Sequence, residues 1–491
     1  MDLTDVARLQ FAATTVYHFL FVPLTIGLTG VVAAFETSWL RTKNPEYLRL
    51  TKFFGKLMLI NFAIGVVTGI VQEFQFGMNW SSYSRFVGDI FGAPLAIEGL
   101  LAFFLESTFL GLWIFGWDRL PRGLHATTMW LTHIGTLFSA YFILAANSWM
   151  QHPVGYAYNP DTGRAELHDF GAVMFNKVQL VTFPHVILAA YMTAGAFVVG
   201  VSGWLYLREA RRPEQTDAVA VERSLYRRGI RIGAVVTLIA SLGVAISGDV
   251  QGKIMTEVQP MKMAAAEALY DTEQPASFSI LTIGTPDGQS EKFAIKIPKL
   301  LSFLATGEFD GRVQGINELR AQYEQQYGQD PGAAYYAADG YVPNIPLTYW
   351  SFRYMIGVGM LGALLAAGLL WLTRKNKAPT GRWWPALAVA TPVLVTLGSS
   401  FGWIFTEAGR QPWAVFGLMS VDQAVSASVT GYEVWTSLIV FTVLYAVLAV
   451  IELRLLATFV RMGAPAFSEP PTPSLRRTDD DTDDAPMAFA Y

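Results

Sequence analysis

The sequence predicts an all-α integral membrane protein with about nine transmembrane helices and a long extracytoplasmic loop between helices six and seven. Of its 491 residues, 52% are hydrophobic and 15% are charged, so the chain is more apolar and less charged than an average soluble domain. Apolar runs close to or above the ~20 residues that a spanning helix needs lie at 15–40, 53–76, 92–117, 126–149, 178–207, 229–247, 348–373, 385–407 and 430–457.

The first helix and the basic residues fix the expected orientation. The run at 15–40 is too long for a signal peptide and lacks a basic segment before it, so we expect it to be retained. Basic residues follow helices one, three, five and seven, at Arg41, Lys43, Arg49, Lys52, Arg119, Arg122, Arg208, Arg211, Arg212, Arg223, Arg227, Arg228, Arg374, Lys375, Lys377 and Arg382. The connections at 77–91, 150–176 and 408–429 are nearly free of them. These patterns place the N-terminus outside and the C-terminus in the cytoplasm.

The chain divides into four parts. Transmembrane helices one to six occupy 1–247, a loop occupies 248–347, and helices seven to nine occupy 348–460. The loop is far longer than an ordinary helix connection, and we expect it to fold, with a strand at 293–297 and a helix at 316–326. Residues 461–491 are rich in Pro and Asp and are predicted to be a disordered cytoplasmic tail. The net charge of −4 indicates no particular partner, and we expect a lipid bilayer but no nucleic acid.

Cysteine is absent, so disulfides and thiolate metal sites are excluded. Histidine occurs six times, at His18, His125, His133, His152, His168 and His185. Two of them fall near the extracytoplasmic ends of apolar helices one and five, where a neutral imidazole is a natural haem iron ligand or else a satisfied core residue. These two are His18 and His185. For the other four, solvated or capping roles are expected.

Carboxyl groups inside predicted helices are further candidates, because unpaired acids are costly in a membrane. Glu98 and Glu106 are eight residues apart, about two turns or roughly 12 Å along one helix. They suit a proton path, or else are packed protonated carboxyls. Glu407 ends an apolar, Trp-rich segment and needs a partner such as a metal, a proton or Arg410. An ordinary interfacial salt bridge with Arg410 is the alternative.

Helix seven begins with Arg353 and Met355. A lone Met in an apolar helix is a core residue by default, whereas the Arg would suit a haem propionate.

Histidine spacing excludes two haem membrane proteins. No two helices each carry two histidines about four turns apart, as a quinol–cytochrome c reductase cytochrome b requires, and the adjacent copper histidines of a haem–copper oxidase are absent.

Together these residues resemble subunit I of the cytochrome bd-type quinol oxidases, in its form with a short quinol loop. The resemblance covers nearly the whole chain to about residue 460, through segments 8–11, 17–24, 88–99, 351–353 and 409–413. It implies that His185 and Met355 hold haem b558 with Arg353 beside it. It also implies that His18 and Glu407 hold the two high-spin haems, b595 and d, and which residue holds which stays open.

Further site residues follow from the same resemblance. It places Glu98 at the haem d pocket, where it can contact the metal, and Arg410 beside the cofactors. It makes Trp403 an electron relay, although an interfacial packing role remains the alternative. Lys262 and Glu267 match residues of quinol oxidation, Glu267 as acceptor of the quinol proton. Their five-residue spacing does not put them on one helical face.

The implied protein is the haem subunit of an electrogenic quinol:oxygen oxidoreductase in a bacterial inner membrane. It would oxidise ubiquinol or menaquinol outside, reduce dioxygen to water, and build a proton motive force without pumping. Protons would enter from the cytoplasm along Glu106, Ser107, Ser139, Asn147 and Glu98. The partners would be a paralogous membrane subunit II and small single-helix subunits. Two alternatives remain: a proton-coupled transporter using Glu98 and Glu106, and a structural membrane subunit without haems.

Overall fold

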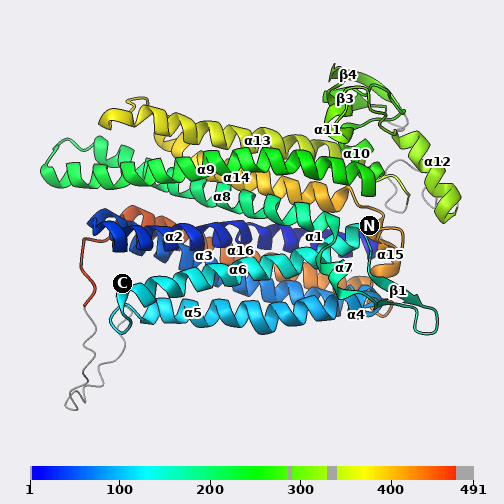
Figure 1. Cartoon of the computed structure of the whole chain (residues 1–491), viewed down its shortest axis with the longest axis horizontal. Coiled ribbons are helices and arrows are strands. Elements are labelled where there is room, and N and C mark those ends of the chain that lie inside the picture. Colours follow the sequence, from blue (N-terminus) through cyan, green and yellow to red (C-terminus); the bar gives the residue numbers. More distant parts are fainter. Residues whose placement is uncertain (1–2, 286–289, 329–339, 472–491) are drawn as a thin grey trace, which may run out of the picture.

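The structure, a computed structural model, describes residues 3–285, 290–328 and 340–471. Long helices lie side by side along one axis (Figure 1). Within the described residues, nine helical segments are long and apolar enough to span a membrane, as predicted. The helices that build these segments are α1 (Leu3–Phe19), α2 (Val22–Thr42), α3 (Pro45–Met78), α4 (Ser81–Ile97), α5 (Phe104–Phe115), α6 (Arg122–Gln151), α7 (Phe170–Met174), α8 (Lys177–Ala210), α9 (Asp217–Val258), α13 (Ile345–Leu372), α14 (Trp384–Ala408) and α16 (Gly431–Met462).

The helices begin and end where local sequence dictates. Asn44 accepts a hydrogen bond from the Glu46 backbone at the start of α3, and Asn344 accepts one from Leu347 at the start of α13, so both act as N-caps. The chain breaks between α1 and α2 just before Pro23, which has no backbone N–H to continue a helix. This first span begins at Leu3, so His18 lies well inside it rather than near its end.

The segment between α9 and α13 packs at one end of the bundle, which we call the loop end (Figure 1). It contains α10 (Pro260–Glu267), β3 (Phe278–Gly284), β4 (Glu291–Ile297), α11 (Leu300–Thr306) and α12 (Ile316–Tyr327). Strands β3 and β4 form an antiparallel hairpin. The predicted strand and helix of the loop are confirmed, since they coincide with β4 and α12. Helix α9 continues eleven residues beyond the apolar run that ends at 247.

Short elements complete the connections. A π-helix, η1 (Glu98–Phe103), joins α4 to α5, and a 3₁₀ turn, η2 (Arg374–Asn376), follows α13. The hairpin β1 (Tyr156–Asn159) and β2 (Arg164–Leu167) follows α6. Strands β5 (Trp413–Val415) and β6 (Met419–Ser420) and helix α15 (Val421–Ala424) lie between α14 and α16. The N-terminus lies at the loop end (Figure 1).

The core relies on close helix approach. A Cβ added to Gly195 on α8 would lie 2.8 Å from the carbonyl oxygen of Gly233 on α9, and the converse distance is also 2.8 Å. Glycine at both positions therefore lets the two backbones touch, as small residues do between membrane helices.

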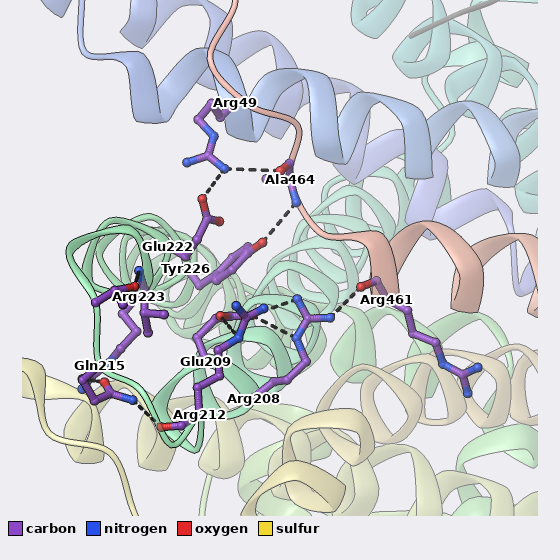
Figure 2. Close-up of polar contacts among 12 residues, drawn as sticks. Arg49, Arg208, Glu209, Arg212, Gln215, Glu222, Arg223, Tyr226, Arg461 and Ala464 are labelled. Atoms are coloured by element: carbon purple, nitrogen blue, oxygen red, sulfur yellow. Dashed lines mark hydrogen bonds and ion pairs between the residues drawn. The ribbon is translucent and has the colours of Figure 1, made fainter.

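Polar contacts fasten the opposite end, which we call the basic end (Figure 2). Arg49 of α3 pairs with Glu222 of α9 at 2.6 Å and donates to the Ala464 carbonyl after α16 at 3.3 Å. Tyr226 accepts a hydrogen bond from the Ala464 backbone at 3.1 Å. These contacts tie three helices together. The disordered tail was predicted from 461, but α16 continues to Met462 and the next residues bond to the bundle through Ala464. The part of the predicted tail from 472 onward lies outside the described residues.

Candidate active site

Glu407 lies at the C-terminal end of α14 and is bonded through both carboxylate oxygens. Oε2 accepts from Arg410 Nη2 at 2.5 Å, and Oε1 accepts from Asn147 Nδ2 on α6 at 3.0 Å. The expected partner Arg410 is thus confirmed. The Arg410 side chain is 6% exposed, and its Nε and Nη1 are buried without a hydrogen-bond partner in the described part of the chain. Because buried donors are costly to leave unpaired, this corner fits a second anionic group.

A row of side-chain hydrogen bonds continues from Glu407 to the loop. Gln151 Nε2 donates to Asn147 Oδ1 at 2.8 Å, and Lys262 Nζ donates to Gln151 Oε1 at 3.0 Å. The structure therefore joins Lys262 of α10 to Glu407 of α14 through two amides of α6. Sequence reasoning missed Gln151, whose only signal was its place one turn after Asn147 on the same helix face.

Helix α10 buries both loop residues named from the sequence. Lys262 is 2% exposed and Glu267 is 3% exposed. Glu267 Oε2 pairs with Arg353 Nη2 of α13 at 2.7 Å, whereas Lys262 contacts Gln151. Their five-residue spacing thus sends the two side chains to different partners, as expected.

Burial also shifts the proton affinities of these two groups. It lowers the pKa of Lys262 to about 7, because a charged ammonium is poorly solvated there. Burial raises the pKa of Glu267, although the Arg353 guanidinium and the Ser279 backbone N–H oppose that rise. A carboxyl with a raised pKa is a stronger base, which suits proton transfer near neutral pH.

Arg353 fastens the loop to α13. Its Nε donates to the Ser279 carbonyl at 3.0 Å, Nη1 donates to the Ala266 carbonyl at 2.9 Å, and Nη2 binds both Glu267 and Ser279. A guanidinium has five N–H donors, so one donor on Nη1 is left for another acceptor.

Two histidines each have a hydroxyl group within hydrogen-bond distance of Nδ1. His18 Nδ1 lies 2.9 Å from Thr68 Oγ1, and Thr68 already donates its proton to backbone carbonyls. His185 Nδ1 lies 3.0 Å from Ser247 Oγ, which likewise donates to the Gly243 carbonyl. Each hydroxyl can therefore accept from Nδ1–H, and in that tautomer Nε2 carries a lone pair suited to a metal. Sequence reasoning missed Thr68 and Ser247, although each is a polar residue within an apolar helix.

Glycines make room beside the candidate ligands. A Cβ on Gly69 would lie 3.2 Å from His18 Cε1, and one on Gly402 would lie 2.9 Å from Met355 Sδ. The Met355 sulfur therefore faces α14. In the described ranges, no three His, Asp or Glu side chains converge on one protein-only metal site.

The expected proton path is only partly joined by direct contacts. Glu98 begins η1, a π-helix of a kind frequent at functional sites, and accepts from Ser139 at 2.6 Å. Glu106 is buried against α6, where a Cβ on Gly135 would lie 3.0 Å from it. Ser107 donates to the Phe104 carbonyl of its own helix. Asn147 contacts Glu407 rather than Glu98.

Trp403 lies between the His18 and Glu407 regions. Its ring stacks on Phe19, the neighbour of His18, with centroids 5.2 Å apart. Its Nε1 is buried with no hydrogen-bond partner among the described residues. This placement brings an aromatic ring between α1 and α14, one turn before Glu407.

Two histidine expectations were wrong. His125 and His133 are 2% and 3% exposed rather than solvated. His125 Nδ1 lies 2.6 Å from Glu36 Oε1 of α2, and His133 lies between Thr29 and Tyr191. Each finds its partners on neighbouring helices, which satisfy the buried ring. His152, in contrast, is the C-cap residue of α6 as expected.

The chain is similar to proteins of one family over nearly all of its length. Residues 6–464 match the family described as "Cytochrome bd terminal oxidase subunit I". "Cytochrome bd ubiquinol oxidase subunit 1" of Bacillus subtilis is 47% identical over 93% of both chains. "Cytochrome bd-II ubiquinol oxidase subunit 1" of Escherichia coli is 38% identical over 96% of this chain and 99% of its own. The solved bd oxidase of Geobacillus thermodenitrificans superposes with a TM-score of 0.80 at 26% identity, covering 94% of this chain and 99% of that one.

Proposed function

This chain belongs to the cytochrome bd terminal oxidase subunit I family. We propose which of its residues bind the haems, oxidise quinol and conduct protons. The chain is the haem-bearing subunit of a terminal quinol oxidase, a quinol:oxygen oxidoreductase. The observation that carries the proposal is a pair of histidines, each with a hydroxyl beside Nδ1 that can accept from Nδ1–H. This arrangement leaves Nε2 available to iron.

Four side chains would hold the haems. His185 and Met355 would hold b558, since an imidazole and a thioether together saturate a low-spin iron. His18 and Glu407 would hold b595 and d, and we favour His18 on haem d with Glu98 at that pocket. The unpaired donors of Arg410 suit a propionate, whereas Arg353 has one donor left for the same purpose. When bound, the haems supply one-electron transfer and an open position for dioxygen.

Quinol oxidation would take place against α10 at the loop end. Glu267 would accept a quinol proton, and Arg353, 2.7 Å away, would keep its carboxylate oriented. Lys262 would orient the ring oxygen from the other side. Lys262 also lines a cavity of about 10 Å³, together with Arg410 and Trp413. That volume fits about one water, so quinol binding requires the surrounding side chains to move. Trp403 would relay electrons between the haems.

Protons for water would enter from the basic end. Glu106, Ser107, Ser139, Asn147 and Glu98 would form the path, with the Ser139–Glu98 hydrogen bond as its joined part. Water would bridge the remaining gaps. Quinol protons would leave at the loop end, so the reaction builds a proton motive force without pumping. This requires the basic end to face the cytoplasm, in agreement with the excess of Lys and Arg there.

The chain is a multi-pass membrane protein of a family whose oxidases are multi-subunit complexes. We propose a paralogous subunit II, small single-helix subunits and a bacterial inner-membrane location. Either ubiquinol or menaquinol remains compatible with the loop.

A visible spectrum of the purified complex tests the proposal. Reduced-minus-oxidised spectra should show a low-spin b band and high-spin b and d bands. The same preparation should consume oxygen when quinol is added. A transporter or a haem-free membrane subunit would show none of these bands, and that result would contradict the assigned ligands.

A further inference from the structure

A hollow at the basic end brings three arginines together at the surface of the bundle. Its volume is about 210 Å³, and it is lined by Tyr47 at the start of α3 and by Ser224, Arg227, Arg228, Arg231 and Ile232 of α9. We call it the α3–α9 hollow. Its lining residues belong to α3 and α9, whereas the candidate active site includes α10, which lies at the loop end (Figure 1).

Two of the three arginines have no partner in the part of the chain that the structure describes. Arg228 is neutralised by an ion pair with Glu46 and lies 4.9 Å above the Tyr47 ring. Arg227 and Arg231 form no ion pair or hydrogen bond within the described residues. They are one turn apart on one helix, so their like charges repel each other. The hollow therefore holds two uncompensated positive charges beside an aromatic ring.

The network next to the hollow provides a contrast. Figure 2 shows Arg49, Arg208 and Arg212 held by carboxylates or backbone carbonyls around Glu222 and Glu209. These three arginines have their acceptors within the chain, whereas Arg227 and Arg231 have none among the described residues and can bind an external anion.

The depth of Arg231 matches a lipid headgroup. Residues 232–248, between Arg231 and Asp249, contain no ionisable side chain. Seventeen helical residues span about 25 Å, close to the ~30 Å of a hydrocarbon core. Arg231 therefore lies at the membrane boundary, where lipid phosphates are found.

An apolar stripe descends from the hollow on the same side of α9. Val235 follows Arg231 by one turn, and Ile239, Leu242 and Ile246 continue with helical spacing. Their exposed fractions are 48%, 67%, 64% and 61%. A positive hollow with an exposed apolar stripe beneath it matches an amphipathic ligand with a phosphate head and acyl tails.

We propose that the α3–α9 hollow binds the phosphodiester headgroup of an anionic phospholipid, whose acyl chain lies along the α9 stripe. Basic hollows between membrane helices are suited to such headgroups. The chain's own acidic tail is the competing occupant. The last described residues lead elsewhere, however, because Glu469 pairs with Arg122 of α6 at 2.9 Å and Pro470 accepts from the same residue.

The test uses the purified oxidase complex, titrated with phosphatidylglycerol or phosphatidylcholine while native mass spectrometry counts bound lipid. The double variant Arg227→Gln/Arg231→Gln should bind phosphatidylglycerol about 25-fold more weakly at one site, since each arginine near an anionic surface contributes about fivefold. The single variant Arg231→Gln should weaken it about fivefold. A visible spectrum equal to wild type shows that each variant is folded.

Matched controls separate the sources of the effect. Arg454→Gln/Arg461→Gln removes the same charge from exposed positions of α16 and should leave the site intact. Equal loss in this control would overturn the proposal, as would equal binding of phosphatidylcholine. Competition by inorganic phosphate or glycerol phosphate at the lipid's own concentration would assign the hollow to soluble phosphates instead. A chain truncated after Pro470 should bind as wild type does, and binding that appears only after truncation would assign the hollow to the tail.

Discussion

Replacing Glu267 by Gln should stop quinol oxidation while leaving the rest of the enzyme in place. The substitution keeps one acceptor oxygen for Arg353, which lies 2.7 Å from the wild-type carboxylate, but it removes the base. Losing a general base typically costs ~10²–10⁴-fold in rate. We therefore expect at least a 100-fold loss of quinol oxidation.

Removing the charge also has a structural cost that must be separated from the chemical one. Breaking a fully buried ion pair costs about 3–5 kcal/mol. The amide oxygen reduces this cost because it can still accept from the guanidinium. The matched control is Glu273→Gln in the same loop, whose pair with Lys296 at 3.3 Å is partly exposed. A pair of that kind contributes at most about 1 kcal/mol, and the control should keep full activity.

The assay compares two electron donors. Oxygen consumption with a quinol should fall in Glu267→Gln, whereas consumption with an artificial donor that reduces the haems directly should stay within about twofold. Wild-type quinol oxidation should slow as the pH drops through the raised pKa of Glu267, because protonation removes the base. This decrease in rate at low pH should be absent in the variant. Equal loss with both donors, or full quinol activity, would refute the assignment.

Three further substitutions test the haem ligands. Met355→Leu should convert the low-spin b signal to high spin, and an unchanged b558 band in reduced-minus-oxidised spectra would exclude Met355. Glu407→Ala should lower the high-spin haem content measured by haem quantification. A mere salt bridge with the buried Arg410 predicts instead a loss of stability, up to about 3–5 kcal/mol as for a broken buried pair, with all haems present. Ser247→Ala removes the acceptor of His185 Nδ1–H and should weaken b558 retention about 10–100-fold, as loss of such a partner does at metal sites. The rate of haem release measures this effect. A release rate in Ser247→Ala equal to that of wild type would show that the Ser247 hydroxyl does not contribute.

Several features of this protein were predictable from local pattern. The spans followed from apolar length, because a bilayer imposes a minimum helix length on every crossing segment. The strand at 293–297 and the helix at 316–326 followed from short-range composition. The Glu407–Arg410 pair followed from its three-residue spacing, which places both side chains on one face of the chain.

The prediction for His125 and His133 failed because local sequence does not show what a neighbouring helix supplies. Position near a helix end suggested solvent, but Glu36, 89 residues away, provides the buried partner of His125. A polar ring can be buried only where another element brings an acceptor, and that element is chosen by packing.

The membrane class, the spans and the set of candidate ligands followed from the amino-acid order alone, since hydrophobic length and residue chemistry act locally. Which of those residues meet depends on how the helices pack. The packing placed Glu267 on Arg353, and it linked Lys262 through Gln151 and Asn147 to Glu407. Helix periodicity gives the face on which a side chain lies. The partner on that face depends on how helices far apart in sequence pack, because close approach at small residues such as Gly195 and Gly233 sets which faces touch.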